Sequence, residues 1–113
     1  MKTSELTGAA LDWAVAKAEG IVWEQGDLDA GEYGPGFAPS INWAHAGPII
    51  EREEIELTFD RAGETDTLWR SEMFDIKGVS IAHEYGPTPL IAAMRCYVAS
   101  KLGDEIEIPE ELK

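Results

Sequence analysis

The most informative segment of the chain is residues 88–103, which read TPLIAAMRCYVASKLG. Thr88 is a favourable N-cap residue, Pro89 suits the first helical position, and Gly103 suits the residue that follows the last turn. Between these ends the side chains are apolar or small nearly all round, apart from Arg95 and two polar residues near the C-terminal end. A helix that is apolar on every side is buried. The segment therefore predicts a helix at the centre of the core.

A second helix is predicted over residues 7–19. Thr7 suits the N-cap, and Gly20 is placed to end the helix in the left-handed conformation. Four small or apolar residues recur at the spacing of one helix face and predict a buried stripe: Leu11, Ala14, Val15 and Ala18. Trp13 lies off this stripe. We expect it to cover an edge of the core or to make a subunit contact, with a ligand role as the alternative.

The centre of the chain predicts a small sheet. In residues 55–59, Ile, Leu and Phe alternate with Glu and Thr, which indicates a half-buried strand. Residues 61–66 are typical of a turn, and residues 67–74 and 77–83 are expected to be further strands. The alternation of Glu and Ile in residues 105–108 predicts a short last strand.

Residues 24–48 are predicted to form one long loop, because eight glycines and prolines punctuate them. The loop also holds Tyr33, Phe37 and Trp43, which are unusual in a flexible linker, so we expect it to fold back onto the domain. These elements together predict an α+β fold in a single small domain, residues 1–113. Two main helices pack on a small, mostly antiparallel sheet, with a long Gly/Pro-rich loop.

The charge balance is strongly acidic. Nine Lys and Arg residues stand against 22 Asp and Glu residues, which gives a net charge of −13. Such a surface repels phosphates, so we expect no direct binding of nucleic acid and no attachment to anionic membranes. No apolar run approaches the roughly 20 residues that a membrane span requires, and the first residues lack the pattern of a signal peptide. We therefore expect a cytosolic protein.

The common catalytic signatures are absent from the sequence. It has no GxSxG, P-loop or HExxH motif, and the only histidines, His45 and His83, have no His or Cys partner at a metal-ligand spacing. The single cysteine, Cys96, excludes an internal disulfide framework and is expected to be a buried structural thiol. We expect no catalytic residues, no metal and no cofactor.

One segment carries the residue types that hold a planar, hydrogen-bonding ligand. Around a Gly-Pro turn within residues 39–52, the candidate ligand-binding residues are Asn42, Trp43, His45, Glu51 and Arg52. Trp43 is suited to stack on a base, and Arg52 to clamp a phosphate. Asn42 and Glu51 are suited to bond a base edge or ribose hydroxyls. The alternative is that Trp43 fills the core and that Arg52 pairs with a neighbouring glutamate.

A second candidate lies where the chain enters the central helix. Residues 85–89 bring Tyr85 and Thr88 to the helix N-terminus, where backbone N–H groups and the helix dipole favour an anion. In the functional interpretation, a ligand phosphate binds above this end of the helix. The alternative is structural, because the Thr88 hydroxyl also suits the helix cap.

Several segments make the sequence resemble a known family. They are Leu6-Thr7-Gly8 with Leu11-Asp12-Trp13-Ala14-Val15-Ala16, Pro39-Ser40 with Trp43, Gly47-Pro48-Ile49-Ile50-Glu51-Arg52, and residues 87–100. With these segments the chain resembles the NinX-like small proteins of tailed phages and prophages, a family of unknown function. The resemblance implies a phage origin and action in the cytoplasm of the bacterial host. It supplies no established activity and no catalytic residues.

A small accessory phage protein without catalytic motifs suggests a binding role. The leading hypothesis is a non-enzymatic protein that binds or sequesters a nucleotide-like small molecule, such as a signal made by a bacterial defence system. The apolar and aromatic content, which includes four tryptophans, also predicts a homo-oligomer.

Two alternatives come from other classes of function. The first is an acidic inhibitor that mimics nucleic acid and occupies a basic site on a host protein. Its acidic clusters are Glu24, Asp27, Asp29 and Glu32, and Asp104, Glu105, Glu107, Glu110 and Glu111. The second is a small nucleotide hydrolase, which the abundant carboxylates allow and the missing motifs disfavour.

Overall fold

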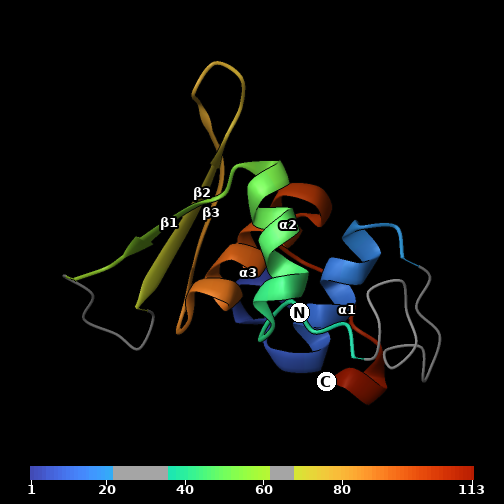
Figure 1. The fold of residues 1–113 in the computed structure, drawn as a ribbon. Helices are drawn as coiled ribbons and strands as arrows, with labels where there is room; N and C mark the ends of the chain where they lie inside the picture. Colours follow the sequence, from blue (N-terminus) through green and yellow to red (C-terminus); the bar gives the residue numbers. More distant parts are fainter. Residues whose placement is uncertain (22–35, 62–67) are drawn as a thin grey trace.

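Helix α3 (Pro89–Leu102) lies at the centre of the structure, a computed structural model that describes residues 1–21, 36–61 and 68–113. One side of α3 contacts all three strands of the sheet, and the other contacts helix α1 (Gly8–Ala18) (Figure 1). The sheet, α3 and α1 therefore form successive layers.

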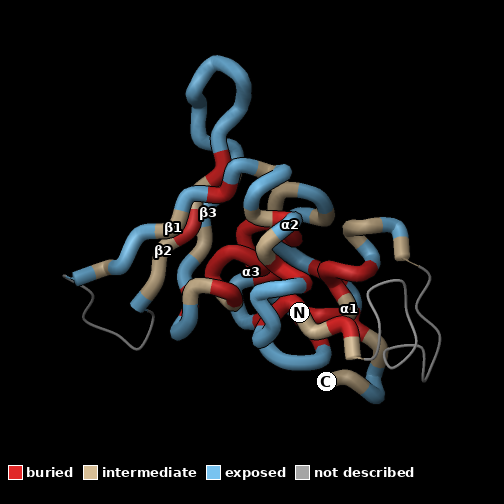
Figure 2. The backbone as a smooth tube through the Cα atoms, in the orientation of Figure 1, coloured by how far each residue is buried: buried red, intermediate tan, exposed pale blue. Residues whose placement is uncertain are grey.

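The ends and the burial of α3 follow its sequence. The side chain of Thr88 caps the helix by accepting a hydrogen bond from the Ile91 N–H group at 3.1 Å. Every residue from Ala92 to Val98 is buried (Figure 2), which confirms the predicted central helix. Within the described parts of the chain, neither α3 nor any other helix is long and apolar enough to cross a membrane.

The sheet is antiparallel throughout, with its strands in the order β1-β2-β3. The strands are β1 (Glu56–Phe59), β2 (Trp69–Phe74) and β3 (Ser80–Gly86). The buried hydroxyl of Ser71 on β2 donates to the Ala92 carbonyl at 2.6 Å and joins the sheet to α3. The helices and this sheet confirm the predicted α+β class.

The β2–β3 hairpin extends beyond the helices (Figure 1). Its strand β3 begins later than the strand predicted over residues 77–83, because residues 75–79 form the turn. Asp75 holds this turn, since its Oδ1 atom accepts hydrogen bonds from the N–H groups of Lys77 and Val79, both at 2.9 Å. Most of the turn predicted over residues 61–66 lies outside the described residues.

Helix α1 matches its prediction to within one residue at either end. Thr7 occupies the N-cap position, and Gly20 adopts a φ of 76°, the left-handed conformation that ends helices. Leu11, Ala14 and Val15 of the predicted stripe are buried in the core, whereas Ala18 and Trp13 are only partly buried and pack against it.

The prediction of one loop over residues 24–48 is wrong for its last part. Residues from Trp43 onward form helix α2 (Trp43–Glu53), and Gly47 and Pro48 lie inside this helix instead of in a turn. Pro48 cannot donate a backbone hydrogen bond to the preceding turn, which destabilises a helix. Burial of one face offsets that cost, through the side chains of His45, Ala46 and Ile49. The described residues thus form three α-helices instead of two main ones.

The strand predicted over residues 105–108 is also absent. A single antiparallel bridge pairs Glu105 with Lys2, and the N-terminal ammonium group of Met1 donates to the Ile106 carbonyl at 2.9 Å. The isoleucines of the segment are buried as the alternation implies, but no continuous ladder forms. Two short 3-10 helices complete the described structure, η1 (Thr3–Glu5) and η3 (Glu110–Leu112).

Candidate functional site

Two of the predicted ligand residues lie at the N-terminus of α2. The Asn42 side chain caps the helix by accepting a hydrogen bond from the Ala44 N–H group at 2.9 Å. Trp43 is the first helical residue and its side chain is 56% exposed, so it does not fill the core. The side-chain amide oxygen of Asn42 therefore has a structural partner, whereas the Trp43 ring remains accessible.

His45 has a structural role in the same helix. Its Nδ1 atom accepts a hydrogen bond from the Ala38 N–H group at 2.9 Å, and its ring lies 5.5 Å from the Phe37 ring. The side chain is buried. An imidazole held in this way fixes the preceding segment against α2 and is not presented to a ligand at the surface.

Arg52 belongs to a network that joins the helices. Its guanidinium group donates to both carboxylate oxygens of Glu19 at 3.1 and 2.6 Å, and to Glu53 at 2.8 Å. These two carboxylates raise the pKa of Arg52, and Arg52 lowers the pKa of Glu53. The alternative in which Arg52 pairs with a neighbouring glutamate is confirmed, with Glu19 as an additional partner.

The geometry of α2 separates the two ends of the predicted site. Trp43 and Arg52 are nine residues apart, which on an α-helix corresponds to about 13.5 Å along the axis and to roughly opposite faces. Glu51 is exposed near the C-terminal end. The structure therefore contradicts the expectation that these residues surround one ligand at a Gly-Pro turn.

Tyr85 and Thr88 lie at the junction of β3 and α3. The Thr88 hydroxyl oxygen caps α3, as the structural alternative predicts for this residue. The Tyr85 carbonyl accepts a hydrogen bond from Nη1 of Arg95 at 2.8 Å, while the Tyr85 side chain is exposed. These contacts connect the sheet to the central helix and commit the Thr88 hydroxyl oxygen to the helix cap as a hydrogen-bond acceptor.

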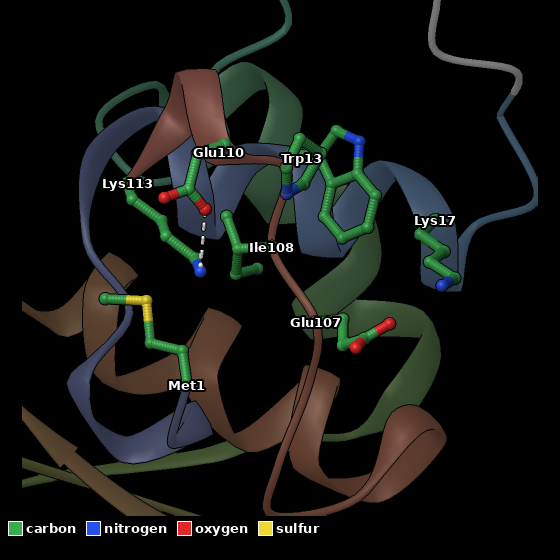
Figure 3. A pocket seen from close by; sticks show the side chains of 8 residues that line it. Met1, Trp13, Lys17, Glu107, Ile108, Glu110 and Lys113 are labelled. Carbon is green, nitrogen blue, oxygen red and sulfur yellow. Dashed lines mark ion pairs between the residues drawn. The ribbon is translucent and has the colours of Figure 1, made fainter.

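A groove on another face brings together residues that the sequence does not place near one another. It has a volume of about 640 Å³, which is within the range of small-molecule sites. We name it the Trp13 groove; it is lined by Met1, Trp13, Lys17, Glu107, Ile108, Pro109, Glu110 and Lys113. Figure 3 shows these side chains, which come from the N-terminus, from α1 and from the C-terminal segment.

One lysine contacts the aromatic ring in this groove, and a second lysine lines it. The Lys17 Nζ atom lies 5.2 Å from the centre of the Trp13 ring, a cation–π distance. Lys113 pairs with Glu110 at 3.0 Å, and both side chains are exposed (Figure 3). The N-terminal ammonium group of Met1 is engaged elsewhere, because it donates to the Ile106 carbonyl and lies 3.8 Å from the Glu105 carboxylate. The lining holds two lysines and two glutamates, and within it an indole face beside the Lys17 ammonium group is suited to a planar ligand that carries negative charge.

Other kinds of site have little support in residues 1–21, 36–61 and 68–113. No group of three or more His, Cys, Asp or Glu side chains in these ranges is arranged to hold a metal ion. Cys96 is buried, as predicted, and burial raises the pKa of its thiol to about 11. A thiol in this state is not a nucleophile at neutral pH.

Of the two acidic clusters in the inhibitor hypothesis, only the C-terminal one lies within the described residues. The first cluster, within residues 24–32, lies outside the described residues. The second cluster lies in the C-terminal segment, and all five of its carboxylate residues are exposed: Asp104, Glu105, Glu107, Glu110 and Glu111.

Comparison with protein families identifies a family for the chain. A protein-family model described as NinX of bacteriophage P22 matches residues 2–101. No curated protein matches the chain. The matched residues include Trp13 and Lys17 and end before residues 107–113, which supply another wall of the Trp13 groove.

Proposed function

The chain belongs to the NinX family of bacteriophage P22, and from that premise we propose that it binds a nucleotide-like small molecule in the Trp13 groove without transforming it. One observation carries the proposal. In a chain with a net charge of −13, two lysines, Lys17 and Lys113, line a groove that holds a half-buried tryptophan, and the Lys17 Nζ atom lies 5.2 Å from the centre of its ring. A general anion site would not need the ring, and a general apolar patch would not need the cations.

Each part of a nucleotide has a counterpart in the groove. A base is suited to stack on the Trp13 ring, as bases stack on aromatic side chains in single-strand binders. Lys17 and Lys113 are suited to a phosphate, which would take the place of Glu110 as the partner of Lys113. The exposed carboxylate of Glu107 is suited to accept hydrogen bonds from ribose hydroxyls or an amino group of the base.

The lining also favours binding over catalysis. The eight lining residues include no histidine, cysteine or serine. Hydrolysis of a phosphate ester usually requires an activated nucleophile or a metal ion, and the lining offers neither kind of group by itself. We therefore propose sequestration of the ligand in the cytoplasm of the bacterial host. A signalling nucleotide of a bacterial defence system fits this role, since a phage benefits from its removal.

The proposal is tested first with the purified full chain from a bacterial host. Heat denaturation followed by mass spectrometry of the released small molecules identifies a bound nucleotide. Calorimetric titration then uses the nucleoside monophosphates and diphosphates of adenine and guanine as probes, with the unphosphorylated nucleosides and inorganic phosphate as partial ligands. We expect nucleotides to bind more tightly than either partial ligand, because the site needs both the ring and the charge.

The matched variants are Lys17→Glu and Lys77→Glu, which change an exposed lysine and the net charge equally. Loss of a charge-assisted hydrogen bond corresponds to about 1.5–3 kcal/mol, so Lys17→Glu should weaken binding by about tenfold or more. Lys77 lies in the β2–β3 turn, far in the sequence from the groove, and its variant should bind as the wild type does. Equal affinity in the two variants contradicts the proposed site.

Two further outcomes would favour the other functions. If no nucleotide binds and a host protein associates in a salt-sensitive way that charge reversal at Asp104 and Glu105 abolishes, the exposed C-terminal cluster acts as an acidic inhibitor. If a bound nucleotide is converted to product by the purified chain, the protein is a hydrolase.

A further inference from the structure

Strand β3 forms one edge of the sheet. It pairs with β2 on one side, and no strand in the described parts of the chain pairs with its other side. A groove of about 380 Å³ follows this edge. The groove is lined by Ile81, Ala82, His83, Glu84, Ala99 and Asp104, so it lies between β3 and the C-terminal end of α3.

The middle of β3 has few of the features that protect sheet edges from further pairing. Natural edges are blocked by proline, lysine, bulges or a covering element. Residues 80–86 contain neither proline nor lysine. At one end of the strand, the Arg95 side chain donates a hydrogen bond to the Tyr85 carbonyl. Helix α3 also covers Gly86 so closely that an added Cβ atom would lie 2.6 Å from the Ala92 nitrogen.

The other end of β3 carries a bulge. Met73 pairs with Ala82 and Phe74 pairs with Ser80, which leaves Ile81 as the extra residue. The Ile81 side chain is 54% exposed and lines the groove. The segment from Ile81 to Glu84 is thus a short open edge with an apolar side chain at one end, and an added strand would follow it for about 14 Å.

The charge on the lining of this groove is mainly negative, although Arg95 lies near Glu84 from the α3 side. Glu84 and Asp104 both line the groove, where His83 is the only lining residue that can carry positive charge. Partial burial and the neighbouring Asp104 carboxylate raise the pKa of Glu84. A β3 strand from a second copy of this chain would bring another Glu84 toward these carboxylates, which disfavours self-pairing. A segment with lysine or arginine is the complementary occupant.

We propose that the open edge from Ile81 to Glu84 binds an extended, basic segment of a partner protein as an added β-strand, with its lysine or arginine side chains beside Glu84 and Asp104 and an apolar side chain against Ile81. Backbone hydrogen bonds to β3 would give affinity, and the two carboxylates would select basic segments. The proposal is independent of the Trp13 groove, because the two grooves share no lining residue.

The first test selects linear nine-residue peptides from a random displayed library on the immobilised full chain. We expect selected peptides to alternate apolar residues with lysine or arginine. The affinity of the best peptide is then measured by fluorescence anisotropy for the wild type, Asp104→Lys and Glu105→Lys. The two variants change adjacent exposed carboxylates by the same charge, but only Asp104 lines the groove. We expect Asp104→Lys to weaken binding about tenfold or more and Glu105→Lys to have a much smaller effect.

The second test examines the backbone pairing directly. Two versions of the selected peptide carry N-methyl groups on alternate residues, odd positions in one and even positions in the other. In a β-strand only every second N–H group faces the neighbouring strand, so one version should lose binding and the other should retain it. Equal binding of both versions overturns the added strand. Equal weakening of peptide binding by Asp104→Lys and Glu105→Lys overturns the site. So does a selection that yields no peptide whose binding depends on Asp104.

Discussion

The carboxylate of Glu19, at the end of α1, accepts hydrogen bonds from both terminal nitrogens of Arg52 on α2, at 3.1 and 2.6 Å. The hydroxyl group of Tyr97 on α3 donates to the same carboxylate. Three helices that are far apart in the sequence are therefore joined at one acidic side chain. This contact explains why Arg52, which has the right chemistry for a phosphate, acts as a structural residue.

Replacement of Arg52 by alanine should destabilise the protein without weakening nucleotide binding. The Glu19 side chain is buried and would lose its cationic partner, while half-exposure of Arg52 limits the effect through solvent screening. We expect a decrease of about 1–2 kcal/mol in the free energy of unfolding, measured by urea denaturation.

Two comparisons complete this test of Arg52. Arg52→Lys keeps the charge but not the paired hydrogen bonds, so its stability should be intermediate. Lys77→Ala serves as a control for removal of an exposed cation. A stable Arg52→Ala protein with impaired nucleotide binding would return Arg52 to the ligand site and contradict its structural assignment.

The sequence predicts α1 and α3 well because their ends carry local signals. Thr88 and Pro89 begin α3, and Gly20 ends α1 in the conformation that glycine favours. Helix α2 is not predicted because Gly47 and Pro48 are typical of turns. Tertiary packing overrides this local preference, since the helix can bury one face only by continuing through Pro48. The signal that remained was Asn42, a favourable N-cap residue.

The candidate site is harder to predict because its parts come from the two ends of the chain. Trp13 and Lys17 are four residues apart in a predicted helix, so their proximity follows from helix spacing. Lys113 lies at the opposite end of the sequence and joins them only through the fold. Within residues 39–52, by contrast, closeness in the sequence wrongly predicts closeness in space. Trp43 and Arg52 are nine residues apart in one helix, which places their side chains on different faces.

The surroundings of Gly86, at the contact between β3 and α3, and of Gly47, in α2, predict opposite effects of substitution by alanine. A Cβ atom at Gly86 would lie 2.6 Å from the Ala92 nitrogen, a backbone atom that cannot move aside alone. Gly86→Ala should therefore destabilise the protein by about 1–3 kcal/mol.

Gly47 provides the matched control for Gly86. It lies inside α2 with no atom within 4 Å of an added Cβ, so Gly47→Ala should stabilise the protein by about 0.5–1 kcal/mol. Thermal unfolding of both variants measures the two effects. A neutral Gly86→Ala would show that the sheet and α3 are not packed this closely.

The thiol of Cys96 should be unreactive in the folded protein. Burial raises its pKa to about 11, so at pH 8 the folded state holds on the order of 100-fold less thiolate than a free cysteine. Labelling with a thiol-specific reagent at pH 8 should be slow in buffer and fast in urea.

The same pKa shift gives a pH dependence of stability. Because the folded pKa is higher than the unfolded one, the contribution of Cys96 to stability is complete below about pH 8.5 and is lost as the pH rises toward 11. Cys96→Ala is the control, since it removes the thiol from both states. Rapid labelling of the wild type in buffer would contradict the buried environment.

The most direct test of the nucleotide site is the indole N–H spectrum of the tryptophans during a titration with a nucleoside diphosphate. Single Trp→Phe variants assign the signals, and phenylalanine keeps an aromatic ring for folding. The proposed function predicts that the Trp13 signal shifts and saturates with the calorimetric dissociation constant, while the signal of the exposed Trp43 stays in place. A saturating shift of Trp43 with an unchanged Trp13 would contradict the account and move the site to the N-terminus of α2.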